Sequence, residues 1–538
     1  MVEQQASPLP NLQPANLASL PIDILVQILD YFRNDEFVDE DRVQWENWDG
    51  QSPDQTICNL RLTCRRLHDL ASPLLFQVVH VELEGKSLRS LEELLSNRHI
   101  ASGVLGLRVA LEYRPAELVA DLAKFVKIKD DALVGILESP DRLNGLAMCF
   151  GRGSPAFERA SAEQMHNRTA MRRAWDNVIE GRDGNEPDEQ VLAYQKILLE
   201  SHEEYARLHE EQLQLIEKGT FVNTLASLLP KGQQSLSLSI QGTRGEDEDD
   251  YIGNYWDVFE DAHGLCDFLT DPHPWVLLDH MDGEVSLPQA KIISELPIAL
   301  HKAGVSLKYF QLSCLPVRSN FSDICPGLDV SPDAAAWHDL QVACQQLKGF
   351  EFVGMGWEYH KKAQMVYIPS EGRAVIEAYL SAVLSGQCLE NVEVDLSGFG
   401  MVDRDSGWTE PCQLTGAFAL VNWPCIKYLD IKGTVFTQEK LERLCLGLGP
   451  SLGDLFLDMI NLWGGSWART LDILREKAVA NPDLLILLED WRGGELGQKT
   501  KVSRDTSSRE WELRDEGLAE RFRQYVQGKE GMENPAKA

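Results

Sequence analysis

Apolar residues along this chain recur in a short pattern that predicts a series of buried β-strands. From about residue 76 onward, six-residue windows carry apolar residues at their first, fourth and sixth positions. The alternation over the last three positions is typical of a strand with one buried face. The windows are FQVVHV from Phe76, VLGLRV from Val104, LNGLAM from Leu143, LKYFQL from Leu307, LKGFEF from Leu347, LENVEV from Leu389, IKYLDI from Ile426 and LGDLFL from Leu452, and QQSLSLSI (233–240) keeps the alternation alone.

Helix-like segments precede several of these windows, such as EGRAVIEAYLSAVLSGQ before Leu389 and TQEKLERLCLGLGPS before Leu452. A helix followed by a short strand, repeated, is the unit of a leucine-rich-repeat solenoid, in which parallel strands line one face. The last five windows begin 40, 42, 37 and 26 residues apart, whereas regular leucine-rich repeats run about 20–29 residues. We therefore predict an α/β (or α+β) fold with an irregular, leucine-rich-repeat-like domain over residues 77–490. A non-repetitive α/β domain is the alternative.

Three further segments interrupt or flank this domain. Residues 155–229 include EQVLAYQKILLESHEEYARLHEEQLQLIEKGTFVNTLASLLP, a long polar helical pattern without a persistent heptad. It predicts a helical insertion beside the strands and no coiled coil. Residues 1–16 are rich in Pro and Gln, and we expect them to be disordered. Residues 491–538 are polar and of mixed charge, which predicts a partly helical C-terminal tail.

The stretch LASLPIDILVQILDYF (17–32) predicts a helix that is apolar on more than one side. Ile24 and Ile28 lie on one face, and Leu25 and Leu29 lie on the neighbouring face. A surface helix needs only one apolar stripe to pack against its own protein. The second stripe is therefore expected to be covered by something else.

Two more short helices follow an acidic stretch, residues 34–54, which we expect to be a loop. The sequence SPDQTICNLRLTCRRLHDLASPLLF (52–76) predicts one helix ending near Arg61 and a second from Leu62 to about Ala71. Three helices within fewer than 60 residues bury little core of their own. Such a small helical unit gains stability by docking on something larger.

The segments 17–32 and 52–76 together resemble the two halves of the F-box motif. The family pattern is a Leu-Pro pair, a helix of the type E-I-L-x-x-I, and then L-x-L-x-C-[KR]-x-[WF]; here Leu20-Pro21 precedes IDILVQIL, and NLRLTCRRLHDLASPLLF follows. The match covers residues 17 to about 76. Asp23 replaces the commoner Glu, Leu67 stands where an aromatic residue is frequent, and the intervening loop is long. Long loops of this kind, and the LASPLLF ending, are similar to F-box proteins of filamentous fungi.

The resemblance implies a substrate-recognition subunit of an SCF-type E3 ubiquitin ligase, acting in ubiquitin-dependent protein degradation. The F-box would dock on a Skp-family adaptor and through it on a cullin, while residues 77–490 would hold an unknown protein substrate. An F-box scaffold acting outside ubiquitination is one alternative, and an enzyme with an unrecognised site in residues 81–490 is another. The predicted adaptor-binding residues are Leu20, Pro21, Ile24, Leu25, Ile28, Leu29, Leu60, Leu62, Cys64, Arg65 and Leu67.

Composition narrows the classes of partner and the compartment. Apolar residues make up 43% of the chain, and the net charge is −33, which disfavours binding to nucleic acid or to an anionic membrane. The first residues carry no apolar signal segment, and no apolar run reaches the roughly 20 residues of a membrane span. We expect a cytoplasmic or nuclear protein. Its eleven cysteines form no Cys-x-x-Cys pair, which predicts reduced, mostly buried thiols.

Catalytic patterns are weak. The segment GGSWA (464–468) resembles a degenerate nucleophile elbow, but no histidine follows Ser466 in the chain, whereas that fold places its histidine after the serine. The segment DPHPWVLLDHMDGE (271–284) groups histidines and aspartates without a zinc-site spacing. We interpret the first as a turn and the second as a polar loop. We therefore expect no enzyme activity, no metal and no cofactor.

Overall fold

The structure is a computed structural model of the 538-residue chain. It describes residues 17, 20–30, 38–39, 42–43, 55–138, 147–182, 188–229, 236–243, 258, 261–281, 286–316, 321–326, 335–353, 370–397, 400–402, 409–411, 414–419, 422–496, 516–528 and 531–537.

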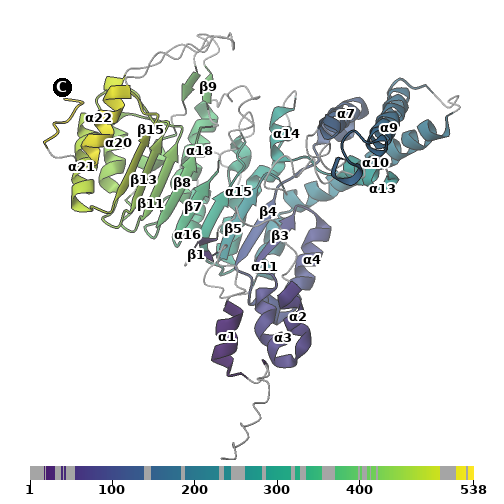
Figure 1. The fold of residues 1–538 in the computed structure, drawn as a ribbon, viewed down its shortest axis with the longest axis horizontal. Coiled ribbons are helices and arrows are strands. Elements are labelled where there is room, and N and C mark those ends of the chain that lie inside the picture. Colours follow the sequence, from purple (N-terminus) through teal and green to yellow (C-terminus); the bar gives the residue numbers. More distant parts are fainter. Residues whose placement is uncertain are drawn as a thin grey trace, which may run out of the picture.

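A nine-stranded parallel sheet forms the centre of a mixed α/β architecture (Figure 1). Parallel neighbours cannot be joined by a tight turn and need a crossover segment, usually a helix. Here each crossover returns the chain to the adjacent position, so the strands follow one another in chain order. The strands are β3 (Val78–Glu82), β4 (Gly106–Ala110), β5 (Leu236–Gln241), β6 (Leu307–Leu312), β7 (Gly349–Phe352), β8 (Asn391–Asp395), β11 (Tyr428–Lys432), β13 (Asp454–Asp458) and β15 (Leu485–Glu489).

Helices between the strands form a second layer along the sheet. Each contacts the next helix of the layer, as expected when successive crossovers pass over the same face. The layer consists of α4 (Gly85–Ser96), α11 (Thr220–Leu228), α15 (Ile292–Lys302), α16 (Ala335–Cys344), α18 (Ser370–Val383), α19 (Gly416–Ala419), α20 (Gln438–Gly447) and α21 (Ala468–Ala480), with α5 (Arg98–Ala101) and η6 (Phe321–Ile324) beside it.

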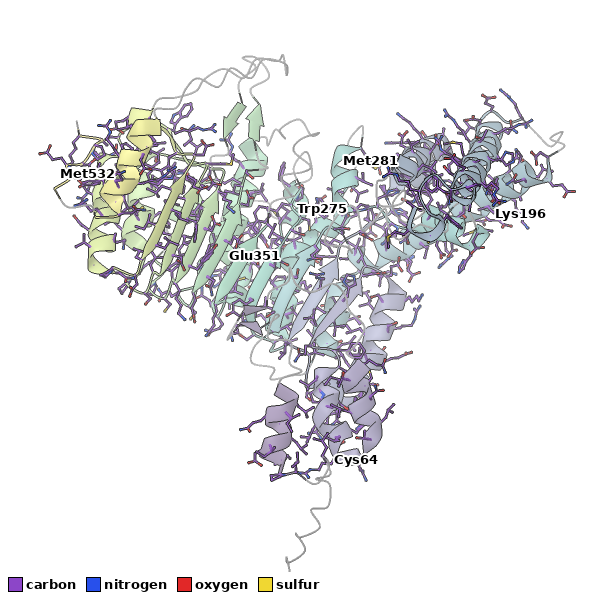
Figure 2. The ribbon with its side chains drawn as sticks, in the orientation of Figure 1. Cys64, Lys196, Trp275, Met281, Glu351 and Met532 are labelled. Atoms are coloured by element: carbon purple, nitrogen blue, oxygen red, sulfur yellow. The ribbon has the colours of Figure 1, made fainter. Side chains whose placement is uncertain are left out.

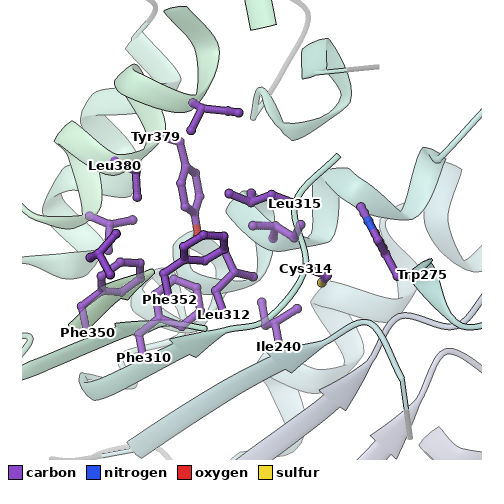
Figure 3. Packing of buried hydrophobic residues seen from close by; sticks show 14 of the residues in the cluster. Ile240, Trp275, Phe310, Leu312, Cys314, Leu315, Phe350, Phe352, Tyr379 and Leu380 are labelled. Carbon is purple, nitrogen blue, oxygen red and sulfur yellow. The ribbon is translucent and has the colours of Figure 1, made fainter. Parts of the chain in front are cut away.

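Two uninterrupted rows of apolar side chains join the sheet to these helices. Each row takes one residue from every strand at matched register, and every member is buried. Figure 3 shows part of this core, where Phe350 and Phe352 of β7 lie below Tyr379 and Leu380 of α18. The rows are Val79, Leu107, Leu238, Phe310, Phe350, Val392, Leu429, Leu455 and Ile486, and Val81, Val109, Ile240, Leu312, Phe352, Val394, Ile431, Leu457 and Leu488.

An N-terminal helical unit projects from the β3 end of the sheet (Figure 1). It contains α1 (Ile22–Asp30), α2 (Gln55–Thr63), α3 (Arg65–Ala71) and the 3₁₀ turn η3 (Ser72–Leu74), and α1 packs on α3. The break between the last two helices falls at Cys64, whose backbone is extended at φ −160° and ψ 162°. This is later than the predicted break after Arg61.

The segment 155–229, for which a helical insertion was expected, lies between β4 and β5 and is helical over most of its described residues. Together with later helices it makes an arm that points away from the sheet, with Lys196 labelled on it in Figure 2. In this arm α10 packs against both α9 and α13. Its elements are α6 (Ala116–Ala120), α7 (Leu122–Glu138), α9 (Pro155–Ile179), α10 (Glu189–Glu217) and α13 (Ala262–Thr270). Helix α14 (Trp275–His280) lies closer to the sheet in Figure 1, and η5 (Pro288–Lys291) packs on α15.

The C-terminal segment is more closely packed than the tail we predicted. Helix α22 (Glu516–Val526) packs on α21 and β15. The Tyr525 hydroxyl donates to Asp472 over 2.8 Å, and the Asn534 amide donates to the same carboxylate over 2.7 Å. A small parallel sheet also lies at this end: β12 (Val435–Phe436), β14 (Asn461–Leu462) and β16 (Arg492–Gly493), followed by η7 (Gly494–Leu496).

The strand predictions fail at two places. In the window from Leu143, the described residues Ala147 and Met148 are helical. Strand β15 was missed because Asp483 occupies the first position of its window, where the pattern requires an apolar residue. Two short antiparallel pairs were also unforeseen: β1 (Val38–Asp39) with β2 (Arg42–Val43), inside the acidic stretch expected to be a loop, and β9 (Gly400–Val402) with β10 (Thr409–Pro411).

Candidate functional site

Helix α1 carries more apolar surface than its own protein covers. At about 100° per residue, its six apolar residues spread over an arc of roughly 200°, and its polar residues share the remainder. Leu25 and Leu29 form the centre of the arc and are only 1% and 5% exposed. On the flanks, Ile22, Ile24 and Val26 are 57%, 38% and 39% exposed. The helix therefore packs on α3 through its centre and presents both flanks to solvent.

A further apolar residue is exposed at the α2 end of the same unit. Leu62 is 84% exposed, and it precedes Cys64, which Figure 2 labels at the end of the unit farthest from the sheet. The two residues lie in the last turn of α2 and at the break before α3. The N-terminal unit thus has exposed aliphatic side chains on α1 and at the α2–α3 junction.

The predicted adaptor-binding residues divide into two groups. Leu25, Leu29 and Leu67 are buried inside the chain, so we correct their assignment: they stabilise the unit and are not available for a partner. Leu29 packs with Ile57 in a small core separate from that of the sheet. The others are exposed or half-buried: Leu20, Pro21, Ile24, Ile28, Leu60, Leu62, Cys64 and Arg65.

The second candidate surface is the face of the large sheet opposite the helices. Since side chains alternate across a strand, the fifth position of each six-residue window points to this open face. At matched register these positions form one row across the nine strands, with basic residues at the β3 end and acidic residues over β7–β11. The row reads His80, Arg108, Ser239, Gln311, Glu351, Glu393, Asp430, Phe456 and Leu487.

This row was not singled out from the sequence, although its signal was present. Positions one, four and six of the windows report the buried face. The polar residue between the last two apolar positions identifies the other face. On β4 and β5 this face is buried, as shown by Arg108 and Ser239, whereas from β7 onward Glu351 and Glu393 are partly accessible.

A shallow depression lies on the accessible part of the open face. It is lined by Tyr309, Gln311, Gly349, Glu351, Asn391, Glu393 and Tyr428, together with backbone of the same strands. Glu351, labelled in Figure 2, lies near the middle of the sheet.

Hydrogen bonds across three strands hold one carboxylate of the depression in place. The Ser239 hydroxyl donates to Gln311 Oε1 over 2.6 Å, and Gln311 Nε2 donates to Glu351 Oε1 over 3.2 Å. Because each partner stands on a separate strand of a rigid sheet, the orientation of the Glu351 carboxylate is set before any ligand binds.

Asp430 is the most deeply buried carboxylate of the row, at 5% exposed. Burial raises its pKa from 3.8 to about 6; the attraction of Lys432 opposes this rise, and Glu393 adds a smaller raising contribution. One oxygen, Oδ2, lies 3.3 Å from Lys432 Nζ. The other, Oδ1, is buried and accepts no hydrogen bond from any residue that the structure describes.

The described residues contain no group of three or more His, Cys, Asp or Glu side chains that could hold a metal ion. His273 is buried beside Lys129 and Arg114, and burial lowers its pKa well below 6.5. Ser466 accepts a hydrogen bond from the Ala468 amide at the start of α21 and donates to Glu495, a helix-start arrangement that agrees with the predicted turn.

The cysteines differ in burial, and the helices bear on the membrane prediction. No disulfide joins the ten cysteines in the described part of the chain, but only Cys314, Cys325, Cys344 and Cys445 are buried, and Cys149, Cys388 and Cys425 are exposed. The expectation of mostly buried thiols is therefore wrong. Among the helices described, none has the length and apolarity required to cross a membrane.

Comparison of the chain with protein-family models, with curated proteins and with solved structures gives no match.

Proposed function

We propose that this chain is the substrate-recognition subunit of an SCF-type E3 ubiquitin ligase. The N-terminal unit would be an F-box that docks on a Skp-family adaptor, which in turn binds a cullin. The sheet and its helices would form an irregular leucine-rich-repeat-like domain that holds a protein target. Ubiquitin transfer would be carried out by the partners, and this chain would supply no catalytic residue.

The exposed aliphatic surface of the N-terminal unit carries the proposal. Ile22, Ile24 and Val26 on α1 and Leu62 at the α2–α3 junction stay exposed although the same unit buries Leu25. Burial of one fully exposed aliphatic side chain contributes roughly 1.5–3 kcal/mol. The remaining exposed surface of these four equals about two such side chains, so they supply on the order of 3–7 kcal/mol. Association costs about 4–15 kcal/mol. The half-buried residues and a polar rim that includes Arg65 must therefore contribute to the contact as well.

The fold supports the second half of the proposal. Parallel strands in chain order, with helices layered on one side, are the arrangement that a leucine-rich-repeat-like array requires. Such arrays bind partners through an extended strand-lined face. The open face described above, which is partly accessible from β7 onward except at the buried Asp430, would be the corresponding surface here.

Co-purification with a fungal Skp-family adaptor tests the docking surface. The full chain is co-expressed with the adaptor, either unchanged or as the double variant Ile24→Asp/Leu62→Asp. Both positions are exposed, so the variant is expected to fold and to lose the adaptor. Substitution of Leu29 would be uninformative because that side chain is buried. Val479→Asp, on α21 and 65% exposed, is the matched control and is expected to retain the adaptor.

Retention of the adaptor by a folded double variant would contradict the proposed docking surface. Far-ultraviolet circular dichroism and thermal melting establish that each variant is folded. Addition of cullin separates ligase from scaffold: the proposal requires a ternary complex, and an adaptor complex that excludes cullin would favour the scaffold.

A further inference from the structure

We propose that the open face over β7, β8 and β11 binds a basic, extended segment of a protein, with arginine or lysine side chains on Glu351, Glu393 and Asp430. Tyr309 and Tyr428 would flank the bound side chains. That the segment belongs to a ubiquitination substrate rests on the proposed receptor function. The binding itself needs no adaptor and can be tested separately.

Charge on this part of the sheet is strongly one-sided. The open-face positions from β7 to β15 contribute seven carboxylates and one ammonium group. Lys348 and Lys427, at the edge where the strands begin, are paired with Glu390 over 3.0 and 2.6 Å. The single carboxylate of Glu390 offsets one of these two positive charges, so this edge keeps one positive charge against the seven carboxylates. The seven carboxylates are Glu351, Glu393, Asp395, Asp430, Asp454, Asp458 and Glu489, and the ammonium is that of Lys432.

Asp430 gives an independent indication that a ligand supplies hydrogen-bond donors here. Its Oδ1 atom is buried without a donor among the residues described, although native proteins satisfy the large majority of such atoms. Lys432 reaches only the other oxygen. A guanidinium or ammonium group that entered between Glu393 and Asp430 would provide the missing donor and the opposite charge, and charge-assisted hydrogen bonds of this kind are stronger than neutral ones.

Aromatic rings complete the chemistry of a cation site. A Cβ atom on Gly349 would lie 2.4 Å from Cδ1 of Tyr309, so the absence of a side chain on Gly349 lets this ring lie across the strand. Tyr428 and Phe456 form a tilted pair with ring centroids 5.4 Å apart. Aromatic faces attract cationic side chains, and Tyr309 and Tyr428 border the depression that holds Glu351 and Glu393.

The spacing of the carboxylates fits an extended peptide that runs across the strands. Neighbouring strands lie about 4.8 Å apart, so the matched positions Glu351 and Asp430, two strands apart, are separated by roughly 10 Å. Alternate side chains of an extended peptide are about 6.6 Å apart. Two basic residues with one residue between them would therefore reach two of the three carboxylates, because their long side chains span the difference.

Binding of a labelled model peptide to the full chain tests the proposal. The probe is a fluorescein-labelled 12-residue peptide of alternating arginine and serine, measured by fluorescence anisotropy at 150 mM salt. A peptide with citrulline in place of arginine keeps the shape and removes the charge. The proposal expects binding of the arginine peptide alone and a roughly tenfold or greater loss of affinity in Glu393→Gln/Asp430→Asn.

A second double variant controls for the net charge of −33. Glu92→Gln/Glu163→Gln removes the same number of charges from exposed positions on α4 and α9 and is expected to bind the peptide as the unchanged chain does. Equal weakening of both double variants would show general attraction of a polycation and would overturn the proposal. Failure of the unchanged chain to bind the peptide would also overturn it. So would a homodimer of the unchanged chain that dissociates in the Glu393→Gln/Asp430→Asn variant, because the acidic face would then bind a second copy of the chain. Adaptor co-purification by the same variant reports on the proposed function separately.

Discussion

Replacement of Asp430 by Asn should stabilise the folded protein, although the substitution removes one partner of an ion pair. The pKa of Asp430 is raised from 3.8 to about 6, first by burial and then by Glu393 and Asp458, against the opposing effect of Lys432. The folded state therefore binds this proton more tightly than the unfolded state does. Stability is then greatest while the carboxyl is protonated, and it decreases as pH rises from about 4 through about 6.

The size of the effect follows from the shift. One pKa unit corresponds to about 1.36 kcal/mol, so a shift of about two units predicts a gain of up to about 3 kcal/mol above pH 7 for a residue that stays neutral. Asparagine has nearly the shape of the protonated carboxyl. After the substitution, Lys432 still faces Asp395 and Asp458 on the neighbouring strands. By the same linkage relation, the gain at pH 5 is roughly half that at pH 7.5.

Urea unfolding followed by tryptophan fluorescence measures this difference. The unfolding midpoint of Asp430→Asn is expected above that of the unchanged chain at pH 7.5, with a smaller separation at pH 5. Glu92→Gln, at an exposed position, is expected to show neither change. A midpoint below that of the unchanged chain, or a separation independent of pH, would refute the reasoning. Higher stability combined with weaker peptide binding would place Asp430 among residues kept for recognition at a cost to stability.

Three further substitutions test other parts of the structure. Gly349→Val would push the Tyr309 ring off the strand, because the new Cβ lies within 2.4 Å of it; we expect severalfold weaker binding of the arginine peptide and unchanged adaptor binding. Lys129→Met would leave the Phe268 carbonyl, which accepts from Nζ over 2.8 Å, without that buried donor; we expect a loss of about 1–3 kcal/mol, measured by thermal unfolding and by faster hydrogen exchange in α13. Trp491→Ala would remove an indole that stacks on the indole of Trp467 at a centroid distance of 4.2 Å. We expect the free energy of unfolding to fall by about 3–5 kcal/mol, seen as a lower melting temperature. An unchanged melting temperature would contradict the assigned packing.

Much of the sheet could be predicted from the sequence because the parallel strands alternate between one buried and one open face. That alternation located the strands containing Phe350, Val392 and Ile431. It failed at β15, where Asp483 stands at the first position of the window in place of an apolar residue. That position lies before the strand begins at Leu485, so a polar residue there does not disturb the strand. The short strands of the second sheet are two residues long, and so they carry no detectable periodicity.

The candidate surfaces were only partly predictable, for a physical reason in each case. Helix α1 has adjacent apolar stripes, and sequence periodicity does not distinguish the stripe that packs on α3 from the one that stays exposed. Leu25 and Ile24 therefore received the same assignment, although only Leu25 is buried. The acidic residues of the open face were readable one by one, but the register that aligns Glu351, Glu393 and Asp430 depends on pairing between strands separated by about 40 residues of sequence.

The closely packed nine-stranded sheet separates the two proposed binding surfaces. The N-terminal unit leads directly into β3, whereas Asp430 stands on β11, six strand positions further along the sheet. At about 4.8 Å per strand, this separation is roughly 29 Å. Both apolar rows beneath the sheet continue without a polar residue between these strands, so a change in spacing would have to open a closely packed core. A segment bound on the acidic row would therefore be held at a nearly fixed distance from an adaptor bound at α1, and a receptor that presents its target to a separate catalytic partner requires this rigidity.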